Sequence, residues 1–357
     1  MRVLIMSANH LGSEYYRVTE PVRAVRELGA DVEVVVRTGL STRTVQSADG
    51  GEPQVVSVDA EGADVVVLQL PKSAGMLRCI ELLQAQGVAV VVEVDDLLSG
   101  VPFGSPAYSA LVTQGMGRRA LECAQQADLV TVSTPALLTE YARHGRGVVV
   151  PNAVPRRIAE LPPAYEREPD VVTVGWTGSA YGHPYDLQEM GSGLQQALDR
   201  TRGRSRFTVL GQKGEARALM GLTDEPTEVP WLRDVDAYAT VVGELFDVGI
   251  APLRLDRFNA CKSWLKALEY SARGVACVRA ASPEYDRLGL GWRARAARDW
   301  AKWTAVAIED PQRRRDQAAA AHAAVLAGHL TEHVAERWVN AWRSARETRS
   351  RSRRKGA

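Results

Sequence analysis

The sequence is poor in cysteine: only four occur among its 357 residues, and none forms a CxxC pair or a spacing typical of a metal site. A disulfide framework and a cysteine-bound metal centre are therefore not expected. We expect reduced thiols, as in a cytoplasmic protein, at Cys79, Cys123, Cys261 and Cys277.

Long apolar runs are also absent. No stretch approaches the roughly 18 apolar residues that a membrane-spanning helix needs. The chain begins with a strand-like segment instead of the basic and apolar regions of a secretion signal. The formal net charge of +1 gives no reason to expect a nucleic acid or a membrane as a partner. We expect a cytoplasmic protein without a membrane span.

Charge is nevertheless uneven along the chain. The segment 343–355 is strongly basic, and we expect residues 347–357 to form a disordered, solvated tail. Contact of this tail with acidic lipid or nucleic acid is the alternative. Lysine is rare, with six among 44 basic residues, yet Lys262 and Lys266 lie within five positions of each other. This clustering is a hint that point charges are needed there.

Short apolar runs alternate with helical patterns from the first residue onward. Runs such as 88–92 are continuously apolar, which is typical of strands buried on both faces of a parallel sheet. A proline-rich stretch at 151–170 then interrupts the pattern, and a second α/β series follows. The strands of the two series are expected at 2–7, 31–36, 64–70, 88–94, 127–133 and 147–150, and at 171–176, 206–210, 247–251 and 275–279. Helices of the first series are expected at 20–28, 77–85, 107–126 and 135–143.

This alternation predicts an α/β fold of two Rossmann-like, doubly wound domains that face a cleft. The final helix carries Val334, Trp338 and Trp342 at a spacing of four and would suit packing back onto the N-terminal domain. The expected divisions are an N-terminal domain 1–155, a linker 156–170, a C-terminal domain 171–330, a crossover helix 331–346 and the tail 347–357.

The segment 258–274, FNACKSWLKALEYSARG, is the most informative part of the chain. Ser263 is a suitable N-cap and Gly274 a suitable C′ residue, which predicts a helix over 264–273. The first turn of such a helix attracts anions, and Lys262 adds a full charge beside it. Glu269 could accept hydrogen bonds from two sugar hydroxyls. Together these features describe a nucleotide diphosphate lying along the helix.

This segment resembles the donor-binding segment of GT-B glycosyltransferases, specifically the retaining group with a Glu-x7-Glu element. Glu269 matches the second Glu, which in that group holds the donor ribose, whereas Cys261 stands at the first. The departure leaves open how the hydroxyls of the transferred sugar are held. The resemblance implies a GT-B architecture whose last helix crosses back onto the N-terminal domain. The other reading of Lys266, Glu269 and Arg273 is a set of helix-surface ion pairs.

Two N-terminal loops could also carry chemistry. The loop 10–17 resembles the GT-B loop that faces the cleft, where Gly12 would let the backbone approach phosphate or acceptor and Arg17 would bind a phosphate. A solvated loop with an exposed Arg17 is equally compatible. Asp95 and Asp96 follow a strand at its carboxyl edge and could orient an acceptor hydroxyl, act as a base or hold a cation; a turn and a helix cap are the alternative. The resemblance implies no bound metal.

Three further positions in the C-terminal half match donor-binding positions of the family. Gly178 and Ser179 follow the first strand in a loop that resembles the one approaching the donor diphosphate. The relatives place an Arg and a Lys shortly afterwards, but His183 and Asp186 stand here, so Lys213 or Lys262 would supply the cation. Trp231 lies where the relatives contact the nucleobase, or it is a partly buried tryptophan after a short strand.

We therefore predict a glycosyltransferase that moves a sugar from a nucleotide-diphosphate-sugar to an acceptor hydroxyl with retention. No tightly bound cofactor is expected. The acceptor is left open among small molecules, glycans, lipids, proteins and modified DNA. The predicted catalytic residues are Asp95, Asp96 and Lys262. The predicted donor-binding residues are Gly12, Arg17, Gly178, Ser179, Lys213, Trp231, Asn259, Lys262, Ser263, Trp264, Lys266 and Glu269.

Two other readings remain. The first is a non-catalytic GT-B module that binds nucleotide or acceptor as a partner subunit, which the substitution at Cys261 keeps open. The second is a nicotinamide-dependent Rossmann enzyme. It is disfavoured because the first strand is followed by HLGSEY and not by a Gly-x-Gly-x-x-Gly motif.

Overall fold

The structure is a computed structural model and describes residues 1–8, 12–46, 53–182 and 185–356, with the backbone alone at 355 and 356. His10, Leu11 and His183 of the motifs above lie outside these ranges. The chain forms two compact units. Unit 1 comprises residues 1–101, 107–152 and 331–357, and unit 2 comprises residues 102–106 and 153–330. The segment 102–106 was expected in the N-terminal domain, but its contacts place it in unit 2.

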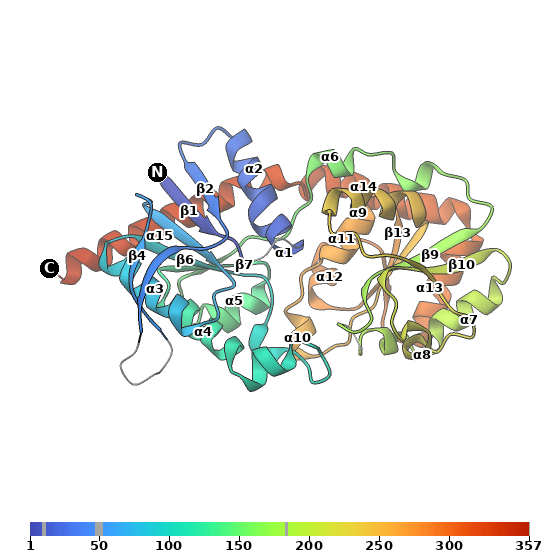
Figure 1. The fold of residues 1–357 in the computed structure, drawn as a ribbon. Helices are drawn as coiled ribbons and strands as arrows, with labels where there is room; N and C mark the ends of the chain where they lie inside the picture. Colours follow the sequence, from blue (N-terminus) through green and yellow to red (C-terminus); the bar gives the residue numbers. More distant parts are fainter. Residues whose placement is uncertain (9–11, 47–52, 183–184, 357) are drawn as a thin grey trace. The chain divides into compact units, whose positions relative to one another are not determined.

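Unit 1 is built on a parallel sheet with the strand order β2-β1-β5-β6-β7-β8 (Figure 1). Val65 to Leu68 and Val90 to Val92 are fully buried or nearly so, as expected for central strands covered on both faces. The strands are β1 (Arg2–Met6), β2 (Glu33–Arg37), β5 (Val65–Gln69), β6 (Ala89–Val94), β7 (Leu129–Val132) and β8 (Gly147–Val149).

Helices connect these strands. They are α1 (Gly12–Glu14), α2 (Glu20–Glu27), α3 (Ala74–Ala85), α4 (Met116–Gln126) and α5 (Pro135–Tyr141), with π-helical turns η1 (Tyr15–Thr19) and η3 (Ser109–Thr113) and 3-10 turns η2 (Leu98–Gly100) and η6 (Thr331–Val334). The predicted helix 107–126 is divided into η3 and α4, because Gly115 between them adopts a φ of +75°. An antiparallel hairpin of β3 (Ser41–Val45) and β4 (Gln54–Asp59) was not predicted.

The last helix, α15 (Ala335–Gly356), belongs to unit 1 and packs on α2, β5, β6 and β7. Its Trp338 and Trp342 are buried, which confirms that the C-terminal helix returns to the N-terminal half. The expectation of a disordered tail from residue 347 was wrong, because the helix continues without a break. Arg349 explains the difference: its side chain forms an ion pair with the buried Asp128.

Unit 2 repeats the same architecture with the strand order β11-β10-β9-β12-β13-β14, again all parallel. The strands are β9 (Val172–Ser179), β10 (Ser205–Gln212), β11 (Thr227–Val229), β12 (Val248–Ala251), β13 (Ala276–Ala280) and β14 (Trp292–Ala294). The predicted α/β fold with two doubly wound sheets is therefore confirmed.

The helices of unit 2 cover its sheet. They are α6 (Arg156–Ala159), α7 (Gly193–Arg200), α8 (Ala216–Met220), α9 (Val235–Leu245), α10 (Arg257–Ala260), α11 (Leu265–Ala272), α12 (Pro283–Leu288), α13 (Ala297–Glu309) and α14 (Pro311–Gly328), with 3-10 turns η4 (Ala164–Glu166) and η5 (Leu187–Met190). Within the ranges that the structure describes, no helix combines the length and the apolar character needed to cross a bilayer.

Candidate functional site

The strand order of unit 2 indicates which edge of its sheet is suited to ligand binding. From β9 the chain first builds outward through β10 to β11 and then returns to the other side with β12. The carboxyl ends of β9 and β12 therefore lie at the topological switch point, where open α/β sheets bind their ligands. The strand β9 ends at Ser179, and β12 leads through a loop into α10 and α11. Both sequence motifs of the C-terminal half thus reach the same edge.

Two glycines bring the backbone close together at this edge. Gly178 has a φ of +145° and Gly211 a φ of +138°, values that strain any other residue. A Cβ on Gly211 would collide with the carbonyl oxygen of Gly178, and one on Gly178 would lie 2.9 Å from the ring of Trp176. Ser179 Oγ donates to Gln212 Oε1 at 2.8 Å and ties the two strand ends together. The loop is therefore fixed by its neighbours at the strand ends.

The helix α11 begins one residue later than expected. Its N-cap is Trp264, and no described side chain caps it, so the prediction of Ser263 as the N-cap was wrong. The position of Trp264 is set by packing: it is buried, its ring meets His329 edge-on at 5.5 Å between centroids, and the guanidinium of Arg287 lies 4.1 Å from it. We assign Trp264 to the core of unit 2. Gly274 adopts a φ of +63° after the helix, as expected of a C′ glycine.

Lys266 carries the strongest electrostatic signal at this edge. Its Nζ donates to the carbonyl oxygen of Thr177 at 2.8 Å and lies 4.9 Å from the centroid of the Trp176 ring. Burial lowers the pKa of Lys266 to about 8, because loss of hydration outweighs the attraction of Asp186 and Glu269. A cation held at the end of β9 next to the Gly178 loop is suited to an anionic ligand group.

Glu269 lies one turn further along α11 and is partly accessible. Its Oε2 accepts a hydrogen bond from the hydroxyl of Tyr238 on α9 at 3.0 Å. Burial, followed by the Glu269 charge, raises the pKa of Tyr238 well above its usual range, so the tyrosine stays a donor. Arg273 does not serve as a surface partner, because it is buried and donates to backbone carbonyls of Ala239, Ile158, Leu161 and Pro162.

Lys262 precedes α11, and its Nζ lies 4.5 Å from the centroid of the Phe258 ring. Lys213 is held on the β11 side: its Nζ lies 3.6 Å from Glu225 Oε2, and its backbone N–H donates to Glu228. The charge of Lys213 is thus balanced by a carboxylate. Trp231 is 53% exposed, and its ring lies 3.1 Å from the Cβ position of Gly211. An exposed aromatic face therefore adjoins the end of β10.

Asp186 was not predicted as a site residue, yet it hydrogen-bonds to the segment that leads into α11. Its Oδ1 accepts from Asn259 Nδ2 at 2.6 Å and from the backbone N–H of Arg254 at 3.0 Å. Both side chains are about 5% exposed, and Asn259 Oδ1 has no partner among the described residues. Cys261 is 2% exposed. The sequence signal was an acidic residue, Asp186, at a position where cations were expected.

In unit 1 the Arg17 side chain bonds to other core residues, so its prediction as a phosphate ligand was wrong. Its Nε forms an ion pair with Glu93 at 2.6 Å, its Nη1 donates to the Val150 carbonyl and to Asn152 Oδ1, and its guanidinium lies 4.7 Å from the Trp338 ring. The side chain is fully buried. The helix-surface alternative for Arg17 was also wrong. Among the described residues, a Cβ added to Gly12 would have no neighbour within 4 Å. The approach of this backbone to phosphate or acceptor therefore stays a prediction.

The two predicted carboxylates of unit 1 have different surroundings. Asp95 Oδ2 accepts from Ser13 Oγ at 2.7 Å, and Ser13 also accepts from Gln69 Nε2 at 3.2 Å. These residues form a polar cluster at the carboxyl ends of β5 and β6. Asp96 Oδ1 accepts from the backbone N–H of Leu97 at 2.9 Å, but no side chain caps the turn η2 that follows, so Asp96 is not a helix cap. Among the described residues no group of His, Cys, Asp or Glu side chains is arranged to hold a metal ion.

The comparisons with known proteins bear on the fold. No protein-family model and no curated protein sequence matches the chain. It is similar to the structure of Anabaena HepE in complex with UDP-glucose, with a TM-score of 0.63 and 14% identity over 95% of this chain and 98% of that one. It is also similar to α,α-trehalose 6-phosphate synthase from Burkholderia multivorans, with a TM-score of 0.55 and 14% identity over 81% and 72% of the two chains. For S. aureus TarM in complex with UDP, the TM-score is 0.55 and the identity 10%, over 78% and 55%.

These solved structures are GT-B glycosyltransferases, and at such identities the likeness speaks for the fold. Two doubly wound parallel sheets, together with a last helix that packs on the first unit, agree with it. The chain has the GT-B fold.

Proposed function

We propose that this protein is a glycosyltransferase that transfers a sugar from a nucleotide-diphosphate-sugar to an acceptor hydroxyl. The observation that carries the proposal is the position of Lys266 and Glu269 on α11, at the switch point of the unit 2 sheet. The proposed donor domain is 171–330, with the acceptor held by the N-terminal domain 1–155.

The proposed donor contacts follow from charge and geometry. The diphosphate lies at the first turn of α11, where unpaired N–H groups and the ammonium groups of Lys262 and Lys266 face negative charge. The Gly178–Ser179 backbone offers further contact. Glu269, oriented by Tyr238, accepts hydrogen bonds from the ribose hydroxyls. Trp231 is the candidate for stacking on the base.

Catalysis would depend on the leaving group. Positive charge around the diphosphate stabilises the negative charge that develops as the glycosidic bond breaks. In unit 1, Asp95 with Ser13 is the candidate for orienting an acceptor hydroxyl. We propose retention by a front-face route, in which the leaving phosphate helps to deprotonate the acceptor and no protein nucleophile is needed. No metal and no tightly bound cofactor take part in this scheme.

A second candidate is a GT-B module that binds nucleotide or acceptor without turnover. The observation that favours it is Cys261, a buried thiol at the position where the related enzymes carry a carboxylate. Hydrolysis of the donor separates the two, because a binding module does not release nucleotide.

The experiment is a panel of UDP-, GDP-, ADP- and dTDP-sugars, with thermal stability and release of free nucleotide measured together. HepE was crystallised with UDP-glucose, so this is the first donor to test. We expect one base to stabilise the protein and its sugar donor to be slowly hydrolysed, with both effects lost in Glu269→Ala. Glu225→Ala, which changes an exposed carboxylate beside Lys213, is the matched control. The absence of any shift with all donors would refute the assignment of α11.

A further inference from the structure

A small cavity adjoins the candidate donor site in unit 2. It has a volume of about 10 Å³, enough for one water-sized group. Its lining combines Pro102, the loop after β9 and residues in and just before α10: Pro102, Gly182, Tyr185, Asp186, Asp256, Phe258 and Asn259.

Asn259, one of the lining residues, carries a hydrogen-bond acceptor without a partner in the described part of the chain. Asn259 donates its Nδ2 hydrogen to Asp186, while its Oδ1 is buried without a partner in the described part of the chain. A buried carbonyl oxygen left unpaired costs about 1–3 kcal/mol, which a bound donor group would recover. An N–H or O–H group bound in the cavity would supply this partner.

The charge of the lining restricts what that group can be. Asp186 and Asp256 are the charged side chains that the described cavity exposes, and both are acidic. A ligand carboxylate placed here would be repelled by the two aspartates. Asn259 Oδ1 could not donate a hydrogen bond to it. A hydroxyl can donate to Asn259 Oδ1 without adding charge. The cavity also lies close to the diphosphate position, because Asp186 is near enough to Lys266 to act on its pKa.

The segment 102–106 adds Pro102 to the lining and places Gly104 next to Tyr185. Gly104 has a φ of +92°, and a Cβ at this position would lie 3.3 Å from the hydroxyl of Tyr185. Tyr185 is in turn flanked by the guanidinium of Arg254 at 5.1 Å from its ring. Tyr185, which lines the cavity, is therefore held by Gly104 and Arg254.

We propose that Asp186 and Asn259, together with Pro102 and Tyr185, form a subsite that binds one hydroxyl of the donor sugar and selects neutral sugars over uronic acids. This inference depends on the proposed function. It supplies the sugar contact that Cys261, which has no carboxylate, cannot make in the same way.

The test compares a nucleotide with its sugar conjugate on the full-length protein. UDP and UDP-glucose are the probes, or the same pair on whichever base binds in the panel. We expect Asn259→Leu to weaken UDP-glucose at least about tenfold more than it weakens UDP. We also expect one monodeoxy-glucose donor to bind the unaltered protein about tenfold more weakly, and to lose no further affinity in Asn259→Leu. UDP-glucuronic acid should bind more weakly than UDP-glucose, with the gap reduced in Asp186→Asn.

Equal loss of UDP and UDP-glucose affinity in Asn259→Leu would overturn the subsite while leaving nucleotide binding intact. No binding of any nucleotide by the unaltered protein would instead refute the proposed function. If Asn259→Leu does not fold, the deoxy-sugar series on the unaltered protein decides the question together with Asp186→Asn. Equal affinity for all deoxy donors would then overturn the proposal.

Discussion

Arg17 is a fully buried cation and Lys266 a half-buried one, and their surroundings differ. Arg17 faces the carboxylate of Glu93 as well as two oxygen acceptors. Lys266 donates to a carbonyl oxygen, which accepts a hydrogen bond without neutralising the charge. Arg17 is therefore a fixed part of the core of unit 1, whereas the charge of Lys266 can still be matched by a ligand.

Donor affinity should consequently depend on pH. The pKa of Lys266 is about 8 without ligand, and an adjacent diphosphate favours the ammonium form and raises it. The phosphates of a nucleotide-diphosphate-sugar are fully ionised throughout this range. We expect constant affinity below pH 7 and a fall of up to about tenfold per unit as the pH rises above 8.

Isothermal titration from pH 6.5 to 9.5 checks this expectation. Lys266→Arg keeps the charge at every pH, so its affinity should show a much smaller slope above pH 8. Lys266→Met should bind weakly at all pH values. A slope of the same size in Lys266→Arg would show that another group titrates.

Removing Arg17 should destabilise the fold. Arg17→Met leaves Glu93 buried beside Thr131 without its cation, and we expect a loss of about 3–5 kcal/mol in the free energy of unfolding. Arg78→Met removes an exposed pair with Glu81 and should cost less than about 1 kcal/mol. Urea denaturation of both variants measures the difference, and equal losses would contradict the internal role of Arg17.

The sequence indicated which segments carry candidate site residues, but it could not show which neighbour each side chain contacts. The pattern in 258–274 predicted the helix that carries Lys266 and Glu269, and the structure places Lys266 against Thr177 of β9 and Glu269 against Tyr238 of α9. Their roles in donor binding stay a prediction. It could not show that Trp264 faces His329 and Arg287, or that Asp186 bonds to Asn259 across 73 positions. Such pairs depend on tertiary packing.

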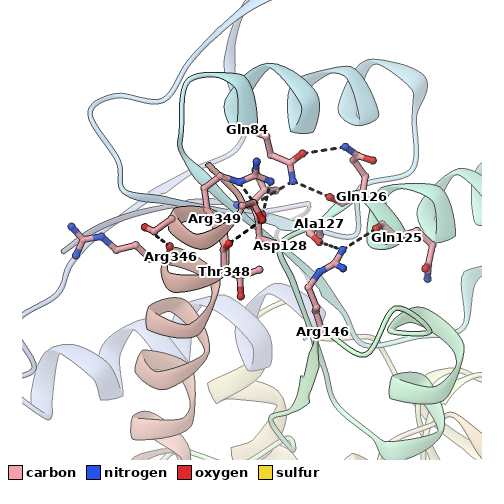
Figure 2. Close-up of polar contacts among 12 residues, drawn as sticks. Gln84, Gln125, Gln126, Ala127, Asp128, Arg146, Arg346, Thr348 and Arg349 are labelled. Atoms are coloured by element: carbon pink, nitrogen blue, oxygen red, sulfur yellow. Dashed lines mark hydrogen bonds and ion pairs between the residues drawn. The ribbon is translucent and has the colours of Figure 1, made fainter. Parts of the chain in front are cut away.

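At the scale of elements, α15 is held to unit 1 by more than its apolar face. Asp128, at the start of β7, accepts from the backbone N–H of Val90 and from Gln84 Nε2, and Arg349 approaches it with Nε at 2.9 Å and Nη2 at 2.5 Å (Figure 2). Arg346 lies 3.2 Å from Asp64. These bonds attach the basic end of the helix to two strand starts.

Arg349→Met should therefore loosen the end of α15. It leaves Asp128, which is 3% exposed, without its cation, and we expect a loss of roughly 2–3 kcal/mol because the Arg349 side chain is partly accessible. Arg351→Met is the matched control, since its exposed pair with Glu347 should contribute under about 0.5 kcal/mol. Thermal unfolding and limited proteolysis after residue 343 measure both effects. Equal protease sensitivity of the two variants would contradict this role.

The regular elements were the most predictable part of the fold. Continuous apolar runs identified β5, β6 and β7, since strands buried on both faces need no polar alternation. The hairpin β3–β4 was missed because β3 is exposed along its whole length and lacks an apolar signal. The length of α15 was missed because its last turns are stabilised by Asp128, a residue more than 200 positions away.

At the scale of the whole molecule, each unit has its own sheet and its own switch point. A nucleotide bound at the carboxyl ends of β9 and β12 should protect unit 2 first. In hydrogen exchange we expect slower exchange in 177–182 and 262–269 with saturating nucleotide, and little change in 335–349. At 100 times the dissociation constant the stabilisation should be about 2.7 kcal/mol. Protection confined to unit 1 would contradict the assignment of the donor site.

The order of the units along the chain has a consequence for synthesis. Unit 2 is a nearly continuous stretch whose two ends meet, because the N–H of Val154 donates to the carbonyl oxygen of His329. Unit 1 is split around it and needs residues 331–356, which are translated after unit 2. Until then Arg17 lacks the Trp338 ring and Asp128 lacks Arg349. The half whose translation begins first is thus completed only after the other half, and until then its sheet lacks the cover of α15 and depends on chaperones.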